Sequence, residues 1–197
     1  MLTILQHYDY QLLIDYYHNN RAHLAPWEPE REPDYFCKYR VRRRLMESNE
    51  LFSVGAAVHF VAFTVDEQAR DVKAKDVKTR DDNDVNYNEI IGVCNFTNII
   101  RGSFQACSLG YSIAEAHQGK GLMKEILTAG IDYMFTEQNL HRIMANYIPS
   151  NTRSGALLSS LGFEQEGVAK SYLKIAGRWQ DHCLTSKINS EYLDKGL

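Results

Sequence analysis

The 197-residue chain lacks the long apolar stretches that would place a protein in or across a membrane. A membrane-spanning helix needs about 18 or more consecutive apolar residues, and no such run occurs. The start of the chain also lacks a basic region followed by an apolar segment, which is the pattern of a secretory signal peptide. We therefore expect no membrane association and a cytoplasmic location.

Cysteine is scarce and scattered. The four cysteines, Cys37, Cys94, Cys107 and Cys183, form no CxxC pair and have no histidine at ligand spacing. We expect them to be reduced and mostly buried thiols, because a cytosolic protein rarely keeps disulfides. The seven histidines are equally dispersed, so the sequence predicts no metal site.

A strong charge of either sign is also missing, because 22 lysines and arginines stand against 25 aspartates and glutamates, for a net charge of −3. Nucleic-acid-binding domains are typically basic, so no direct nucleic-acid binding is expected. Hydrophobic residues make up 44% of the chain, and chains divide into domains only beyond about 250–300 residues. We expect a single domain over residues 1–190, a tail over 191–197, and a monomer or weak dimer.

Hydrophobic periodicity predicts that helices and strands alternate along this domain. Apolar residues at three- and four-residue spacing predict helices over residues 9–20, 34–48, 121–138 and 150–162. Runs rich in valine, isoleucine and aromatic residues predict strands over residues 55–65, 90–99, 106–113 and 141–148. A final strand pair turns at Ala176 and Gly177. This order predicts an α/β or α+β sheet with one parallel pair joined by a crossover helix.

Polar segments interrupt this pattern. Residues 24–33, LAPWEPEREP, contain three prolines and predict a loop, because proline has no N–H to donate and blocks a helix. Residues 66–89 carry charges of both signs and few large apolar side chains, which predicts a mobile hairpin extension, either as filler or as a partner-binding segment. Four arginines on the helix over 34–48 either grip phosphate or form a solvated face. They are Arg40, Arg42, Arg43 and Arg44.

The stretch HQGKGLMKEIL, residues 117–127, places Gly119 and Gly121 around Lys120 and then continues as a helix. Glycine in a helix interior costs roughly 1 kcal/mol relative to alanine, so these glycines serve something other than helix stability. The first N–H groups of a helix lack partners, and glycines let the backbone wrap closely around an anion. The stretch therefore predicts a phosphate-binding turn, and the alternative is an ordinary tight connection between a strand and a helix.

Two common phosphate-binding patterns do not fit this turn. The pattern GxxxxGK[ST] fails because Gly121 follows Lys120, and GxGxxG fails because Lys124 stands where its last glycine would be. The turn instead resembles the pyrophosphate loop of the GNAT N-acetyltransferases, Gln/Arg-x-x-Gly-x-Gly/Ala. Gln118 and Gly121 occupy its first and fourth positions, and Met123 departs from the sixth.

Further segments carry the same resemblance. Residues 151–163, NTRSGALLSSLGF, are similar to the GNAT segment in which an asparagine begins a helix ending in Leu-Gly-Phe, and Ser150 or Asn151 can cap this helix. The segments HLAPWEP, LGYSI and HRIMANY narrow the resemblance to ribosomal-protein-alanine N-acetyltransferases of the RimJ type. The extension over 66–89 is longer than that pattern usually allows.

This resemblance implies a mixed, mostly antiparallel, twisted sheet flanked by helices, with a splayed central pair of parallel strands. It implies an enzyme that needs no metal and transfers an acetyl group from acetyl-CoA to the N-terminal α-amine, on alanine, of a ribosomal protein. The residues that it implies for cofactor binding are Tyr111, Ser112, Ile113, Gln118, Gly119, Lys120, Gly121, Leu122, Met123 and Asn151.

The catalytic residues of the family carry over only in part. This chain has Asn146 where some members have a glutamate base, and Leu158 where many have a tyrosine acid. The resemblance to relatives of the RimL type implies that Ser154 protonates the departing thiolate or steers the sulfur. Asn146, as a polar side chain at the position of the base, is the candidate to orient a water that removes the proton of the amine. The alternatives are that Ser154 satisfies the helix backbone and that Asn146 is a structural polar group. Backbone N–H groups of residues 110–113 are expected to polarise the carbonyl.

Two further points stay open at the level of the sequence. Trp27 stands between two prolines, and its side chain either lines the acceptor's side of the site or fills the core beneath the loop. Two rival functions also fit: a GNAT enzyme that acts on a small amine, and a CoA-binding regulator or ribosome-assembly factor whose catalysis is secondary.

Overall fold

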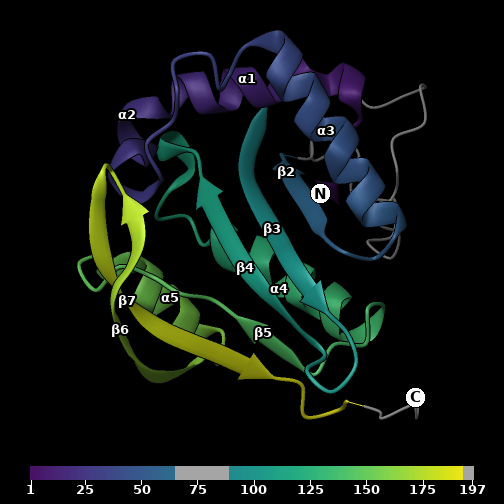
Figure 1. The fold of residues 1–197 in the computed structure, drawn as a ribbon, viewed down its shortest axis with the longest axis vertical. Coiled ribbons are helices and arrows are strands. Elements are labelled where there is room, and N and C mark those ends of the chain that lie inside the picture. The colour runs from purple at the N-terminus through teal and green to yellow at the C-terminus, as the bar shows by residue number, and fades with distance from the viewer. Residues whose placement is uncertain (65–88, 193–197) are drawn as a thin grey trace.

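The central sheet confirms the predicted mixed topology (Figure 1). The computed structural model describes residues 1–64 and 89–192. The strands of these residues are β1 (Leu2–Thr3), β2 (Val58–Phe63), β3 (Ile90–Ile100), β4 (Ala106–Ile113), β5 (Arg142–Met144), β6 (Glu164–Ile175) and β7 (Arg178–Ile188). They follow one another in the order β1-β2-β3-β4-β5-β7-β6. All neighbours are antiparallel except β4 and β5, which are parallel.

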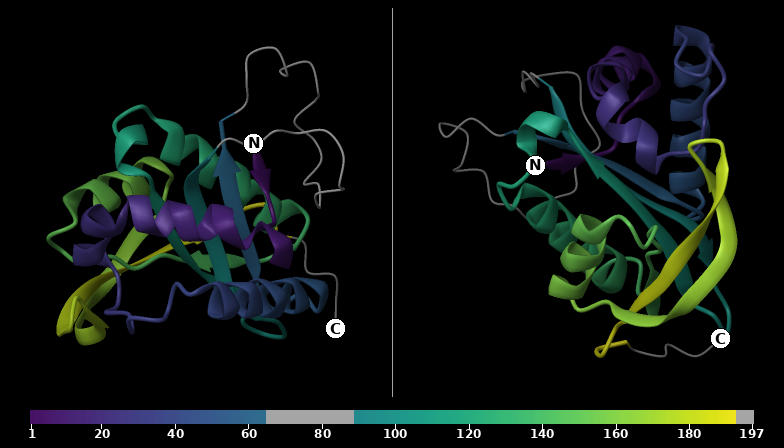
Figure 2. Two further views of the ribbon diagram at one scale, coloured as in Figure 1. Left: turned by 90° about the horizontal axis from the view of Figure 1, so that it is seen from above. Right: turned by 90° about the vertical axis from the view of Figure 1, so that its left-hand side faces the viewer.

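Helices cover both faces of this sheet (Figure 2). They are α1 (Tyr10–Asn19), α2 (Arg21–Leu24), α3 (Lys38–Ser53), α4 (Leu122–Thr136) and α5 (Thr152–Ser160), with 3-10 helices η1 (His7–Asp9), η2 (Ala25–Trp27) and η4 (Glu115–His117). On one face, Tyr16 of α1 and Val41 of α3 share a buried core with Val61. On the other, Leu127 of α4 and Leu158 of α5 belong to a larger core. We call these the α1 face and the α5 face. None of the described helices is long and apolar enough to cross a membrane.

Side chains of β4 alternate between the two faces, as successive residues of a strand do. Cys107 and Leu109 are buried in the core of the α5 face, and Tyr111 packs against the same core. Ser112, the next residue, instead reaches Tyr16 of α1, with the two hydroxyl oxygens 2.8 Å apart. Odd-numbered residues of β4 therefore face α5, and even-numbered residues face α1.

Elements with a strong local signal lie where the sequence predicts them. β4 has the predicted bounds, and β6 and β7 turn at Ala176 and Gly177 as expected. Asn151 caps α5, because its Oδ1 accepts the backbone N–H of Ser154 at 3.1 Å. The parallel pair β4 and β5 is joined through α4, which confirms the predicted crossover.

Three predicted segments differ from the structure. The second helix begins at Lys38 rather than at residue 34, because Tyr35 and Phe36 form a turn in which the Phe36 ring lies 5.1 Å from that of Tyr17. The proline-rich loop contains η2, whose first turn holds Pro26, a place where the missing N–H costs nothing. The strand predicted over 141–148 is regular only over β5, and beyond it Tyr147 forms an isolated bridge with Cys183. The extension predicted over 66–89 lies outside the described residues except for its last one.

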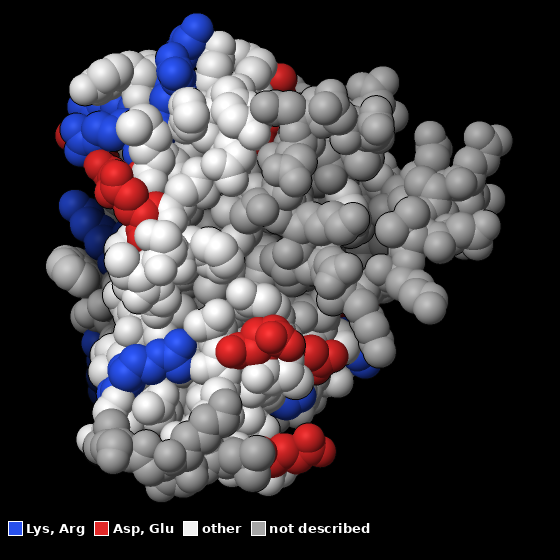
Figure 3. All heavy atoms as spheres, turned by 90° about the vertical axis from the view of Figure 1, so that its right-hand side faces the viewer, with Lys and Arg blue, Asp and Glu red and all other residues white. Residues whose placement is uncertain are grey.

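The arginines of α3 mostly have partners of their own. Arg40 contacts Glu32 at 3.0 Å and Asp34 at 2.8 Å, and Arg43 contacts Glu47 at 2.9 Å. Arg44 stacks over the ring of Tyr35 at 3.7 Å. On the face drawn in Figure 3, basic and acidic side chains likewise stand in small interspersed groups. These contacts favour a solvated helix face over a phosphate-binding role for the arginines. Exposed ion pairs of this kind contribute only about 0–1 kcal/mol to stability.

The cysteines match the expectation of mostly buried, reduced thiols. Cys94, Cys107 and Cys183 are buried, Cys37 is exposed, and all four are free. Burial raises the pKa of the Cys94 and Cys107 thiols, so both stay protonated and unreactive near neutral pH.

Asn20 ties the end of α1 to the segment that follows β4. Its Nδ2 donates to the carbonyl of Tyr16 at 2.8 Å, and its Oδ1 accepts the N–H of Glu115 at 2.8 Å. We expect Asn20→Ala to lower the free energy of unfolding by about 1–3 kcal/mol, because a buried hydrogen-bonding group loses its partner. Urea denaturation measures this, and the neighbouring exposed residue gives a control, Asn19→Ala, with an effect below about 0.5 kcal/mol. An Asn20→Ala protein as stable as the parent would contradict this role.

Candidate active site

The parallel strands β4 and β5 separate and leave a gap in the middle of the sheet. Their register runs only from Ala106↔Arg142 to Ser108↔Met144, where β5 ends, whereas β4 continues to Ile113. The chain after β5 turns toward β7, because Tyr147 forms an isolated antiparallel bridge with Cys183. The second half of β4 therefore has β3 on one side and the gap on the other.

Backbone groups of β4 point into this gap. The carbonyl of Gln105 accepts N–H groups from His141 and Arg142 on the β5 side, at 2.9 and 3.1 Å. On the β3 side, the N–H of Ala114 donates to Ile91 at 2.8 Å. Because backbone direction alternates along a strand, the odd-numbered residues Tyr111 and Ile113 direct their N–H and C=O groups into the gap. Such N–H groups can polarise a carbonyl placed there.

The glycine turn leads from the end of β4 into α4. Gly119 and Gly121 have φ values of 71° and 77°, in the left-handed region that favours glycine. A Cβ added at either glycine would meet no protein atom within 4 Å. Within the described chain, the backbone N–H groups of residues 119–123 donate no hydrogen bond. Free N–H groups beside open space at a helix N-terminus fit a pyrophosphate well. They favour a phosphate-binding turn over an ordinary tight connection between a strand and a helix.

The side chain of Gln118 does not point to a free anion site but joins two other elements. Its Nε2 lies 2.8 Å from Nε2 of His23 in α2, and its Oε1 accepts from Nη1 of Arg153 in α5 at 2.7 Å. Arg153 thereby brings a guanidinium to the edge of the glycine turn. No sequence pattern marks this contact, because His23 and Arg153 lie 95 and 35 residues away from Gln118.

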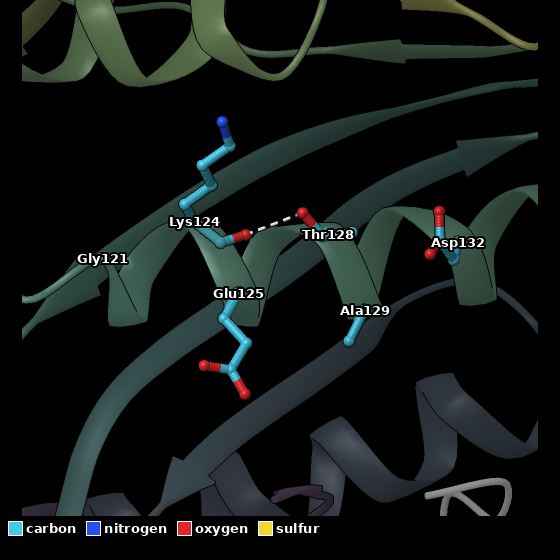
Figure 4. A pocket seen from close by; sticks show the side chains of 6 residues that line it. All are labelled: Gly121, Lys124, Glu125, Thr128, Ala129 and Asp132. Atoms are coloured by element: carbon cyan, nitrogen blue, oxygen red, sulfur yellow. Dashed lines mark hydrogen bonds between the residues drawn. The ribbon is translucent and has the colours of Figure 1, made fainter.

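A hollow of ≈ 460 Å³ runs along the outer side of α4 and begins at the last glycine of the turn (Figure 4). Its lining residues are Gly121, Lys124, Glu125, Thr128, Ala129 and Asp132. The side chains of Lys124 and Glu125 point to opposite sides of the helix in this view. Two carboxylates line the hollow, so it does not suit phosphates, and the turn itself remains the place for them.

On the α5 face, the structure brings together three of the predicted residues. The hydroxyl oxygens of Tyr111 and Ser154 lie 2.6 Å apart, and the Ser154 N–H donates to Asn151 Oδ1. Burial raises the pKa of Tyr111 to about 12, although the hydrogen bond with Ser154 opposes the shift. Tyr111 therefore stays protonated at neutral pH. When it donates to Ser154, the serine keeps its own proton for another acceptor.

On the α1 face, two other predicted residues lie apart from this group. Ser112 is held by Tyr16 and faces away from Tyr111, although the resemblance implies that both bind the cofactor. Asn146 donates through Nδ2 to the hydroxyl of Tyr172 at 3.3 Å and accepts the N–H of Thr185 at 3.4 Å. Its amide thus joins β6 and β7 to the end of β5.

A bulge in β6 aims Tyr172 at this position. The register of β6 and β7 shifts between Ala169 and Leu173, and Ser171 has a φ of 47°. The N–H of Ser171 donates to Oδ1 of Asp181 at 2.8 Å, which holds the bulge in place. The ring of Tyr172 then lies 5.4 Å from that of His182. Sequence reasoning missed Tyr172 and His182, because the bulge that brings them together is visible only in the strand register and in the positive φ of Ser171.

Trp27 lies on the surface beside the tip of the β6–β7 hairpin. It is 39% exposed, which excludes the plug beneath the loop. The next residue, Glu28, accepts the backbone N–H of Ala176 at 3.0 Å. Figure 1 shows α2 and this hairpin side by side, next to the end of β4.

Comparison with known proteins relates this arrangement to one family. The acetyltransferase (GNAT) domain family matches residues 21–164. The [ribosomal protein uS5]-alanine N-acetyltransferase of Escherichia coli (strain K12) is 49% identical over 174 residues, which cover 88% of this chain and 79% of that protein.

Solved structures extend the similarity over nearly the whole chain. The crystal structure of ribosomal-protein-S5-alanine acetyltransferase from Vibrio fischeri has a TM-score of 0.84 and 39% identity, and covers 98% of this chain and 94% of that one. Mycobacterium smegmatis RimJ in complex with CoA-disulfide has a TM-score of 0.79 and 25% identity, and covers 98% and 83%. The family match spans the gap, the glycine turn and α5, and it ends at the first residue of β6.

Proposed function

The chain belongs to the GNAT acetyltransferase family, and from this premise we propose that it acetylates the N-terminal α-amine, on alanine, of a ribosomal protein. It is an acetyl-CoA-dependent N-acetyltransferase. The gap beside β4 is the observation that carries the proposal, because it joins the hydroxyl pair on the α5 face to the β6–β7 hairpin on the α1 face. The acetyl donor and the amine can meet there from opposite faces of the sheet.

Acetyl-CoA binding rests on the glycine turn. The free N–H groups of residues 119–123 hold the pyrophosphate, and Lys120 and Arg153 add positive charge beside it. Leu122 and Met123 contribute through the backbone, because the Met123 side chain is buried in the core and that of Leu122 packs against it. That position explains why methionine is compatible with the sixth place of the loop pattern. The thioester then follows β4 toward the gap.

The chemistry follows from the groups around the gap. The N–H groups of Tyr111 and Ile113 polarise the thioester carbonyl while the neutral amine attacks it. An α-amino group has a reference pKa of about 7.7–8.0, so a sizeable minority is already neutral at pH 7. Ser154, backed by Tyr111, protonates the departing thiolate, which completes the exchange of the C–S bond for a C–N bond.

The acceptor is assigned from the relatives and from the surface around Trp27. The E. coli and V. fischeri relatives are named for the alanine of ribosomal protein S5. Trp27 and the hairpin offer an exposed aromatic wall beside the gap, which suits an extended peptide. A ribosomal protein as acceptor is consistent with a cytoplasmic location.

A product assay tests this function. The protein is incubated with acetyl-CoA and with peptides that start with alanine, serine or methionine, or with a polyamine, and the products are identified by mass spectrometry. We expect acetylation of the α-amine of the alanine peptide above all others. A matched peptide with a blocked N-terminus and an internal lysine controls for acetylation of side chains. Acetylation of the polyamine alone would make the chain a small-amine acetyltransferase instead, and no product at all would favour a binding role.

A further inference from the structure

His182 of β7 is a buried histidine with one ring nitrogen left unpaired. Its side chain is only 4% exposed, and Nδ1 lies 3.1 Å from the carbonyl oxygen of Gln180. A carbonyl oxygen can only accept a hydrogen bond, so Nδ1 carries the proton and Nε2 presents a lone pair.

That lone pair is directed to accessible space. Within the described chain, Nε2 of His182 has no hydrogen-bond partner. No buried side-chain nitrogen or oxygen of the described residues lacks a partner, so Nε2 is the atom through which this ring reaches solvent. A protonated donor that enters from outside is the partner that this nitrogen can take.

The direction of the ring follows from strand alternation. Cys183 lies beside Tyr147, which packs against the core of the α5 face, so its neighbour His182 turns to the α1 face. Ala145 belongs to the same core, and Asn146 therefore also turns to the α1 face. His182 and Asn146 thus face the side from which the amine approaches.

Tyr172 completes the group. Its ring lies against that of His182, and its hydroxyl accepts a hydrogen bond from Asn146. Among the described residues, no group accepts the hydroxyl proton of Tyr172. The group therefore offers one hydrogen-bond acceptor and one donor on the same side of the gap.

We propose that Nε2 of His182 accepts a proton from the α-ammonium of the acceptor, while the Tyr172 hydroxyl donates to the carbonyl oxygen of its first residue. This inference rests on the proposed function and names its base and its positioning residue. A peptide N-terminus presents an ammonium and a carbonyl on adjacent carbons, which match the acceptor and the donor of this group. A polyamine or a lysine side chain lacks that carbonyl, so the group selects α-amines.

The protons balance in this scheme. His182 takes one proton from the ammonium before attack and later returns it to solvent. The nitrogen forms its bond to the acetyl carbon and the C–S bond breaks. The thiolate takes the proton of Ser154, and the second proton from nitrogen replaces it on the serine. One amide, one thiol and one released proton result.

Other titratable groups around His182 are already engaged or turned away. Within β7, the carboxylate of Asp181 accepts from Ser171, and Cys183 turns to the α5 face. The ion pair of Arg142 in β5 with Glu166 in β6 lies at the far end of β7. Tyr172 is the titratable group in ring contact with His182.

The pH dependence of kcat/KM tests this role. His182→Asn keeps a donor for the Gln180 carbonyl and removes the Nε2 acceptor, and His182→Gln is a second variant. For an alanine-starting peptide, we expect kcat/KM to fall about tenfold at pH 6.5 and to approach the parent at pH 9, where the amine is neutral by itself. We expect Tyr172→Phe to raise KM for the peptide about threefold or more, with no change in the shape of the pH profile and no effect on a polyamine.

Several outcomes would overturn the proposal. One is a folded His182 variant within threefold of the parent at pH 6.5, and another is a loss that is equal at pH 6.5 and pH 9. If neither variant folds, the pH profile of the parent enzyme gives the answer. A kcat/KM that follows only the ionisation of the amine contradicts an enzyme base, and a plateau below the pKa of the amine supports one. A parent that acetylates no α-amine overturns the proposed function itself, whereas an active parent with unaffected variants overturns this inference alone.

Discussion

Ser154→Ala should lower kcat and kcat/KM for an alanine-starting peptide together, by about 100-fold. The Ser154 hydroxyl lies 2.6 Å from that of Tyr111, which stays protonated and can donate to it. The serine proton is then available to the departing sulfur, an interaction that exists mainly in the transition state. CoA thiolate is a good leaving group, so the effect belongs at the low end of general-acid contributions, which run to about 10⁴-fold. Steady-state kinetics measures it.

Matched variants separate this role from a structural one. Tyr111→Phe should lower kcat less than Ser154→Ala, because the serine proton remains while its orientation is lost. Ser159→Ala, an exposed change on the same helix, should leave kcat unchanged. All three proteins should bind acetyl-CoA as the parent does, because the glycine turn is untouched. A folded Ser154→Ala protein with a kcat within threefold of the parent would mean that Ser154 only satisfies the helix backbone.

Gly121→Val should weaken CoA binding by at least tenfold, which corresponds to about 1.4 kcal/mol. Gly121 caps the N-terminus of α4 with a φ of 77°, and an L-residue in that region costs roughly 1–2 kcal/mol. The added Cβ would meet no protein atom within 4 Å, so the strain and the space reserved for the ligand cause the loss, not a clash within the protein. Titration calorimetry with CoA measures the loss.

Gly102 provides the control for this prediction. It has a φ of 70° and no atom within 4 Å of an added Cβ, and it lies between β3 and β4, away from the glycine turn. Gly102→Val should therefore lose stability in the same way and keep its affinity for CoA. Equal affinity in the parent and in a folded Gly121→Val protein would remove the argument that this turn holds phosphates.

Elements with a local cause were predictable from the sequence. β4 alternates apolar residues (Cys107, Leu109, Tyr111 and Ile113) with small ones, and the hairpin of β6 and β7 turns at Ala176 and Gly177, so a few neighbouring residues decide each of them. The start of α3 was predicted too early. Phe36 packs against Tyr17 of α1 and Tyr35 stacks with Arg44, and that packing overrides local helix preference.

The features of the site also divide into those with a local cause and those that only the fold brings together. The sequence by itself determined the glycine turn, because its free N–H groups and left-handed glycines belong to adjacent residues and need no distant partner. Only the tertiary structure decided that Tyr111 meets Ser154 while Ser112 faces the opposite side, since strand register and alternation set both. It likewise decided that a bulge in β6 brings Tyr172 to Asn146 and His182. Contacts between strands depend on how the whole sheet pairs, and no single stretch of this chain encodes that pairing.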